Sequence, residues 1–304
     1  MKVSRKFRNV ESSHPLETTM KSLKKAAHIA VNLLLLAAFG TAAAAASPLF
    51  LPRGLAVDSK GNLWVANSGA NNILMYTPTY ALQKTKTITS NISNPTGVAF
   101  GPQGNLWVAN YGTSNGGPTG SIAEYINGVQ NTAATITDGI LGPEGIAIDG
   151  SGDVWINMNF SNVAIYGPRY SYDYPIYPMK TLNTGTPTLG LAIAAGVVAY
   201  GDDFVVHMDS SAQILANGFI YDSVVIRNTG ISVAIDSKGN VYMGNTDNSV
   251  QVFQKFSEYI LLQLSFTPYA MAIDNVRGRI YIANSDGNSI SVYSTAGALL
   301  HVIQ

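Results

Sequence analysis

Glu144, His207 and Asp209 are the side chains whose types could do chemistry. A histidine together with carboxylates can transfer protons in general acid–base catalysis. Carboxylate and amide oxygens are also the ligands that calcium prefers, so Glu144, Asn157 and Asp209 are suitable types for a metal site. The same residues fit equally well as isolated, solvated side chains on the rim of a protein. The elements that must position them decide between these interpretations.

Composition excludes several other kinds of chemistry. The 304 residues include no cysteine, which rules out disulfides, thiol catalysis and thiolate zinc sites. Residues 1–46 hold seven Lys/Arg and two Asp/Glu, so the remainder, with 11 basic and 16 acidic residues, has a net charge of 11 − 16 = −5. A mildly acidic body without a basic stripe argues against nucleic-acid binding. No His-Glu-x-x-His, phosphate-loop or calcium-loop motif is present.

One phrase recurs along the chain and indicates the architecture. "PRGLAVDSKGNLWVAN" at 52–67 returns almost unchanged as "PTGVAFGPQGNLWVAN" at 95–110. Further copies begin near Gly145, Ser232 and Ala270, and a worn copy near Gly190 keeps only the apolar alternation. A period of this length is typical of propellers and solenoids.

Each unit carries four strand-like pieces. In the first unit these are "GLAVD", "LWVAN", "NILMY" and "ALQKTKTIT", the first two joined by the turn "SKGN". Asp58 can accept backbone N–H groups in that turn, and Gly61 tolerates positive φ. The sequence therefore predicts an all-β fold, a six-bladed β-propeller of four-stranded antiparallel blades over residues 47–304, with the last blade packed on the first.

Two recurring residue types have a structural explanation. One aromatic position on the second strand of five units predicts packing between blades rather than a ligand platform; its members are Trp64, Trp107, Trp155, Tyr242 and Tyr281. An asparagine at the end of that strand predicts turn capping; it recurs as Asn67, Asn110, Asn245 and Asn284.

The repeated phrase resembles the NHL repeat. Residues 52–67 and 95–110 match its pattern nearly throughout, and the similarity covers about residues 48–304. The resemblance implies a six-bladed propeller and an exported bacterial protein. More distantly, the chain resembles streptogramin lyases, whose chemistry uses histidine and glutamate near a metal. It also resembles gluconolactonases, which hold calcium with Glu, Asn and Asp at the channel mouth.

By analogy with other propellers, function is expected on the face where the loops leading into the first strands meet. That face should present Arg53, Thr96, Glu144, Thr188, Ser232 and Tyr269. A tyrosine-rich loop, "YGPRYSYDYPIYP" at 166–178, could anchor a partner or stack on sugars. The candidate partner-binding residues are Arg53, Tyr111, Tyr170, Tyr172, Tyr174 and Tyr269.

Three function classes follow. The preferred one is a non-catalytic binding scaffold without a cofactor, which takes a protein, a glycan or a small molecule on the channel face. The second is a metal-dependent lyase or lactonase that uses Glu144, His207 and Asp209, with calcium as the implied ion. The third, a purely structural envelope protein, is not distinguished from the first by the sequence.

The N-terminal residues are typical of an export signal. From Met20, three lysines precede an apolar stretch and a run of alanines that ends at Ala46. The alternative is a membrane anchor, but the apolar stretch falls short of the roughly 20 residues that a span needs. We therefore expect an upstream extension at 1–19, a signal peptide at 20–46, and a periplasmic or extracellular protein with no membrane span after cleavage.

Overall fold

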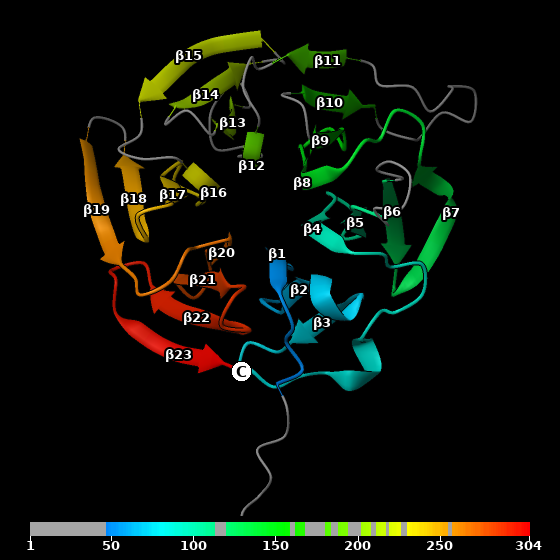
Figure 1. The fold of residues 1–304 in the computed structure, drawn as a ribbon, viewed down its shortest axis with the longest axis horizontal. Helices are drawn as coiled ribbons and strands as arrows, with labels where there is room; N and C mark the ends of the chain where they lie inside the picture. The colour runs from blue at the N-terminus through cyan, green and yellow to red at the C-terminus, as the bar shows by residue number, and fades with distance from the viewer. Residues whose placement is uncertain are drawn as a thin grey trace, which may run out of the picture. The chain divides into compact units, whose positions relative to one another are not determined.

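The chain folds into antiparallel sheets whose strands follow one another in sequence order (Figure 1). The computed structural model describes residues 47–112, 120–158, 162–167, 180–183, 188–193, 202–207, 211–216, 219–225, 230–254 and 257–304. Residues 47–304 belong to one unit. The fold is an all-β propeller with four-stranded antiparallel blades, as the repeat predicts.

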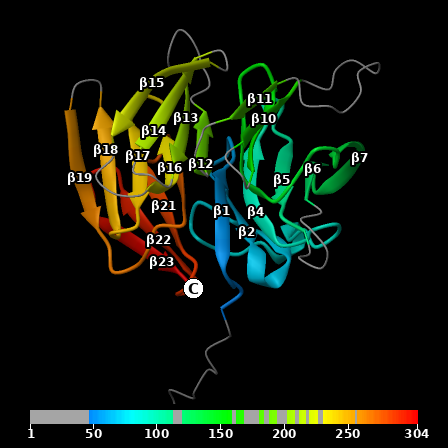
Figure 2. The ribbon, with the colours of Figure 1, turned by 45° about the horizontal axis from the view of Figure 1, so that its top comes forward.

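Five sheets have four strands each. The first three of these consist of β4 (Pro95–Phe100), β5 (Leu106–Asn110), β6 (Ser121–Ile126) and β7 (Val129–Ile136); β8 (Pro143–Ile148), β9 (Val154–Met158), β10 (Asn162–Tyr166) and β11 (Lys180–Asn183); and β12 (Thr188–Ile193), β13 (Asp202–His207), β14 (Ser211–Ala216) and β15 (Phe219–Val225). The other two consist of β16 (Gly230–Ile235), β17 (Val241–Asn245), β18 (Ser249–Gln254) and β19 (Ser257–Gln263); and β20 (Ala270–Asp274), β21 (Arg279–Asn284), β22 (Ser289–Ser294) and β23 (Leu299–Ile303). In the tilted view of Figure 2, β19, β18, β17 and β16 follow one another from the edge towards the centre.

The prediction of six four-stranded blades is wrong, because only five described sheets are complete. The first sheet has three strands, β1 (Pro52–Val57), β2 (Leu63–Asn67) and β3 (Asn72–Tyr76), with the short 3-10 turn η1 (Ser68–Ala70) before β3. The expected fourth strand at 81–89 is interrupted by a second 3-10 turn, η2 (Lys84–Lys86), and joins β3 through two isolated bridges. Residues 84–86 are all exposed, so this segment has no apolar alternation to hold it as a strand.

The turn between the first and second strands is fixed by its aspartate, as predicted. Asp58 Oδ1 accepts the N–H groups of Lys60 and Asn62, at 2.9 and 2.8 Å, and Oδ2 accepts the Nε1–H of Trp64 at 3.1 Å. Gly61 has φ +83°, the left-handed region that favours glycine. The aspartate thus joins the turn to the recurring aromatic residue of its own sheet, Trp64.

The first strands of the sheets form a closed ring. Each first strand contacts the next one around the ring: β1 contacts β4, β4 contacts β8, β8 contacts β12, β12 contacts β16, and β16 contacts β20. The ring closes because β20 contacts β1. Apolar clusters fill the spaces between neighbouring sheets; one joins Trp107 of β5 to Ile146 of β8, and another joins Tyr242 of β17 to Met271 of β20. The prediction that the recurring aromatics pack between sheets is confirmed at these positions.

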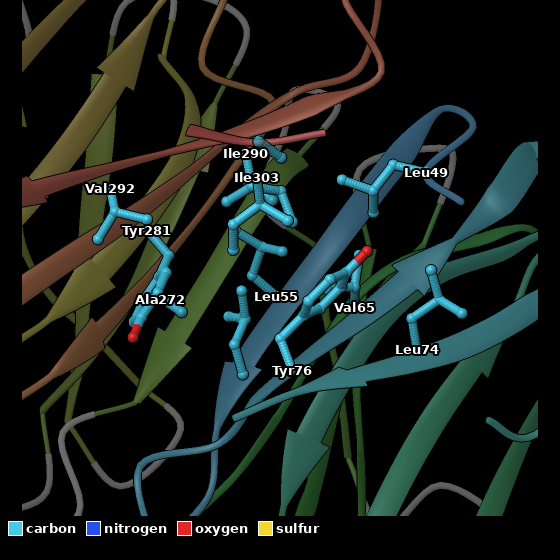
Figure 3. Packing of buried hydrophobic residues seen from close by; sticks show 13 residues of the cluster. Leu49, Leu55, Val65, Leu74, Tyr76, Ala272, Tyr281, Ile290, Val292 and Ile303 are labelled. Carbon is cyan, nitrogen blue, oxygen red and sulfur yellow. The ribbon is translucent and has the colours of Figure 1, made fainter. Parts of the chain in front are cut away.

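The ring closes where the first and last sheets meet, as predicted. Leu55 and Val65 of the first sheet share one cluster with Tyr281 and Ile303 of the last (Figure 3). Leu49, which precedes β1, is 2% exposed and belongs to the same cluster. The residues on both sides of the closure are therefore joined by a continuous apolar core.

Hydroxyl groups add a second link between neighbouring sheets. Thr96 Oγ1 donates to the carbonyl oxygen of Pro143 at 2.6 Å, and Ser232 Oγ donates to that of Pro268 at 2.6 Å. Ser68 donates in the same way to Pro95, and Ser285 to Pro52 across the closure. In each case a serine or threonine hydroxyl binds the carbonyl oxygen of a proline in the next sheet. That proline is either the first residue of the first strand or lies just before it.

A search of the described residues for a helix long and apolar enough to cross a membrane finds none.

Candidate functional site

A β-bulge at the start of the first strand recurs in five sheets. The register shifts between Pro52 and Gly54, Pro95 and Gly97, Pro143 and Gly145, Thr188 and Gly190, and Gly230 and Ser232. The residues left over by these shifts are Arg53, Thr96, Glu144, Leu189 and Ile231. Bulges of this kind re-aim side chains and are frequent beside functional sites. In the last sheet the corresponding position is Tyr269, which directly precedes β20 and donates its N–H to the carbonyl oxygen of Ala283.

Four of the bulge residues, Arg53, Thr96, Glu144 and Ile231, meet Tyr269 at one cavity of about 80 Å³, which is large enough to hold water. Among the described residues, its polar lining consists of Arg53, Thr96, Glu144, Ser232 and Tyr269. Five of the six residues that the sequence assigned to the channel face are therefore brought together. The sixth, Thr188, has no described side chain.

Two of these five residues serve the scaffold. The hydroxyls of Thr96 and Ser232 are buried and donate to the proline carbonyls of the next sheets. The register also places Ile231, not Ser232, at the bulge of β16, and Leu189, not Thr188, at that of β12. Counting back one residue from the Gly54-equivalent position in each repeat would have found this slot.

Glu144 is the single carboxylate among the described residues that line the cavity. Burial raises the pKa of its carboxyl group, and the positive charge of Arg53 opposes this by a smaller amount. Arg53 itself is exposed. Among ion pairs between described residues, the one within 4.0 Å joins Arg277 to Asp274, so Arg53 and Glu144 face one cavity without forming a salt bridge.

Tyr269 supplies an aromatic wall with a polar tip. Its side chain is 37% exposed, and its hydroxyl lies 3.4 Å from Oδ2 of Asp286. Burial, followed by the negative charge of Asp286, raises the pKa of Tyr269, while Arg53 acts in the opposite direction. The phenol therefore stays protonated and able to donate at neutral pH.

The described structure places only some of the residues predicted as a metal or catalytic set. Asn157 is fully buried opposite Gly145 and is not among the lining residues. His207 ends β13 in the register position that Asn67 holds in β2, and its side chain is not described. Asp209 lies outside the described residues. Within them, no group of three or more His, Cys, Asp or Glu could hold a metal ion, and the calcium set stays a prediction.

The predicted partner-binding tyrosines fall in different places. Tyr269 lines the cavity, whereas Tyr111 follows β5, is half-buried, and donates its N–H to the carbonyl oxygen of Asn94 at 3.1 Å. Tyr170, Tyr172 and Tyr174 lie outside the described residues. The tyrosine-rich loop therefore stays a prediction.

The recurring asparagines hold the segment that leads into the first strand, rather than only a turn. Asn67 Oδ1 accepts the N–H of Phe50 at 2.6 Å, and its Nδ2 donates to the carbonyl oxygen of Pro48 at 2.9 Å. Asn110 binds Ser93 and Asn91 in the same way. Turn capping in the predicted sense is seen at Asn284, whose Oδ1 accepts the N–H of Gly287.

Comparison with known proteins supports the fold. No protein-family model matches the chain, and no curated protein matches it. Among solved structures, it is similar to a gluconolactonase from Xanthomonas campestris, described as important in glucose secondary metabolic pathways. The two are 14% identical with a TM-score of 0.61, over 78% of this chain and 84% of that chain. At this identity the likeness shows a shared propeller fold, and the NHL resemblance stays a prediction.

Proposed function

We propose that this protein is a non-catalytic binding propeller that takes a small polar ligand at the mouth of its central channel. The observation that carries the proposal is the set of bulges, which aim Arg53 and Glu144 at one cavity that Tyr269 also lines. These three residues differ from those at the same position in other sheets, so packing does not require them. A guanidinium, a carboxylate and a phenol offer donors and an acceptor to a ligand.

Binding fits the cavity better than catalysis. Acid–base catalysis needs a proton donor and acceptor at the reacting atoms, commonly a pair of groups with separated pKa values. The described lining offers one carboxylate and no histidine. A cavity with few charged groups among apolar walls is typical of ligand recognition.

The proposal is tested by a thermal-shift screen of small polar metabolites against the wild type and a variant with Arg53, Glu144 and Tyr269 all changed to alanine. A ligand at a hundred times its Kd adds about 2.7 kcal/mol to the free energy of unfolding, roughly 5–10 °C for a domain of this size. We expect at least one ligand to raise the Tm of the wild type alone. Ligands that stabilise both proteins equally would place binding elsewhere.

A second candidate is a metal-dependent lactonase or lyase. The fold shared with a gluconolactonase favours it, together with the position of Glu144 in the cavity; His207 and Asp209 would be its other members. Thermal unfolding in EDTA and then in excess calcium tests this candidate. A calcium-dependent rise of roughly 5–10 °C that is lost in Glu144→Ala would support it, and an unchanged Tm would contradict it.

We also propose that the chain is an exported NHL-type protein, periplasmic or extracellular. The repeated phrase and the lysine-then-apolar pattern of residues 20–46 support this. Mass spectrometry of the protein recovered from a bacterial expression host tests it. A mature N-terminus close to Ser47 is expected, and an intact N-terminus in the cytoplasmic fraction would contradict export.

A further inference from the structure

The cavity at the channel mouth carries one positive and one negative group that do not neutralise each other. Arg53 and Glu144 lie on β1 and β8, with β4 between them in the ring. Neither side chain has a hydrogen bond to another described residue, and the two form no ion pair within 4.0 Å. The charge of Arg53 nevertheless acts on Glu144, so the two groups share one electrostatic environment.

The remaining polar groups of the lining are already engaged. Thr96 and Ser232 bind proline carbonyls of neighbouring sheets, and Tyr269 lies within hydrogen-bond distance of Asp286. A polar ligand would therefore find its strongest partners in Arg53 and Glu144. Charged hydrogen bonds of this type are about twice as strong as neutral ones.

Apolar side chains make up the rest of the wall. Among the described lining residues, five first strands each contribute an apolar side chain that is only 5–8% exposed: Leu55, Val98, Ile146, Val233 and Met271. Ile231 occupies the bulge of β16 itself. Such a wall favours a ligand with a short aliphatic part.

A singly charged ligand fits this arrangement poorly. An anion on Arg53 would be repelled by ionised Glu144, and a cation on Glu144 would be repelled by Arg53. A molecule that carries both charges satisfies both groups at once. We propose that the channel mouth binds a small zwitterion, an α-amino acid with a short apolar side chain, whose carboxylate binds Arg53 and whose ammonium binds Glu144.

This inference rests on the proposed binding function and assigns its ligand class. The test measures binding to the full chain by calorimetry with L-valine, with isovalerate, which lacks the ammonium, and with isobutylamine, which lacks the carboxylate. We expect L-valine to bind at least about tenfold more tightly than either analogue, because each analogue leaves one of the two charged groups without a partner.

Two single variants assign the charges. Arg53→Gln and Glu144→Gln should each weaken L-valine binding by about tenfold or more, since each removes a charge-assisted contact. Glu144→Gln should also strengthen isovalerate binding, because it removes the repulsion. Lys60→Gln, in an exposed turn, is the control and should bind L-valine as the wild type does. Unchanged Tm values without ligand would show that the variants fold.

Three outcomes overturn the inference. If isovalerate binds the wild type as tightly as L-valine, the cavity is a simple anion site. If Glu144→Gln leaves L-valine binding unchanged, the ammonium is not recognised there. A third outcome is that L-valine does not bind, while another metabolite from the screen binds the wild type and not the triple variant. The ligand class is then wrong, and the proposed binding function stands. Only a screen with no metabolite sensitive to the triple variant contradicts both.

Discussion

At the scale of single residues, the turn of the third sheet differs from the same turn in other sheets by one residue, and this difference costs stability. In the first sheet Asn62 Nδ2 donates to Asp58 Oδ2 at 2.8 Å, and the equivalent Asn240 donates to Asp236 at 2.7 Å. The third copy of the turn carries Asp153 at this position. Its Oδ1 is buried without a hydrogen-bond partner among the described residues. Burial and the nearby charge of Asp149 raise the pKa of Asp153.

We therefore expect Asp153→Asn to stabilise the protein by about 0.5–1.5 kcal/mol at pH 7, because the amide restores the missing donor. The sign follows from proton linkage. When folding raises the pKa of a carboxyl group, the free energy of unfolding of the protein falls as the pH rises from the unfolded-state pKa of that group through its folded-state pKa. The gain should therefore be small in acid and reach its full size above the raised pKa. Urea unfolding at several pH values measures it.

The reverse substitution in another sheet is the matched control. Asn240→Asp should destabilise the protein by a similar amount and introduce the same pH dependence, since it places a second carboxylate beside Asp236. If both substitutions leave the free energy of unfolding unchanged, the residue at the position of Asp153 and Asn240 does not affect stability.

Two equivalent tyrosines provide another comparison. Tyr125 donates its hydroxyl to the carbonyl oxygen of Ser90 at 2.8 Å, whereas the buried hydroxyl of Tyr76 has no partner among the described residues. Burial raises the pKa of both phenols to about 12, so both stay neutral. Tyr125→Phe should cost about 0.5–1.5 kcal/mol, while Tyr76→Phe should be neutral or stabilising. Equal losses in chemical denaturation would show that Tyr76 has a partner.

At the scale of the elements, the first strands approach one another closely enough to require glycine. A Cβ at Gly54 of β1 would lie 2.7 Å from Gly97 Cα and 2.8 Å from the carbonyl oxygen of Thr96, both backbone atoms. The turn glycine Gly150 has no heavy atom within 4 Å of such a Cβ. The glycine of the repeated Pro-x-Gly thus sets the spacing of β1 and β4 in the ring.

We expect Gly54→Ala to destabilise the protein by about 1–3 kcal/mol or more, because backbone atoms cannot move aside. Gly150→Ala is the control and should be neutral or stabilise by up to about 1 kcal/mol. Each kcal/mol corresponds to about 2–4 °C in Tm for a domain of this size. A Gly54→Ala protein with the Tm of the wild type would contradict the close approach.

The elements also show where the sequence was informative. The repeated phrase predicts the strand pairs, the Asp58 turn and the interior aromatics because these depend on neighbouring residues. It fails at residues 81–89, where apparent alternation hides exposed Lys84 and Lys86. In the second sheet Gly101 stands where the first sheet has the turn aspartate. The sequence also could not show that Glu124 of β6 accepts hydrogen bonds from Asn105 and Asn131 in this sheet. That contact joins residues distant in the chain.

The candidate site was predictable in part. Their place in the loops that lead into the first strands pointed to Arg53, Glu144 and Tyr269, and the cavity unites them. The same reasoning selected Thr96 and Ser232, whose hydroxyls bind the next sheet, because single residues do not reveal contacts between repeats. His207 was selected because it is the only histidine within the repeats apart from His301, and its backbone occupies the slot of a scaffold asparagine.

At the scale of the whole molecule, the closure depends on a few side chains near β23. Ile303 is 4% exposed in the closing cluster, while neighbouring Val302 is 38% exposed. On the outer side, His301 stacks on Tyr80, with ring centroids 4.3 Å apart, and Arg279 lies over the same ring. These contacts join the last sheet to the first.

Ile303→Ala should therefore destabilise the protein by about 2–5 kcal/mol, and the control Val302→Ala by about 0.5 kcal/mol or less. Deletion of residues 298–304 should abolish the cooperative unfolding transition, since it removes a whole strand from the closing sheet. Circular dichroism melts of the three proteins measure this. A deletion protein that melts like the wild type would show that the closure does not need β23.

The contacts of Leu49 and Leu51 with the last sheet have a consequence for how the protein is made. Leu51 donates its N–H to Asn288 Oδ1 at 2.8 Å, and Leu49 lies in one cluster with Ile303. Residues at the start of the first sheet are thus translated long before their partners in the last sheet. Until then the nascent first sheet presents Leu55, Val65 and their neighbours to other chains. Slow translation would prolong that exposure, so the yield of native protein should depend on translation speed and on chaperones that cover this face.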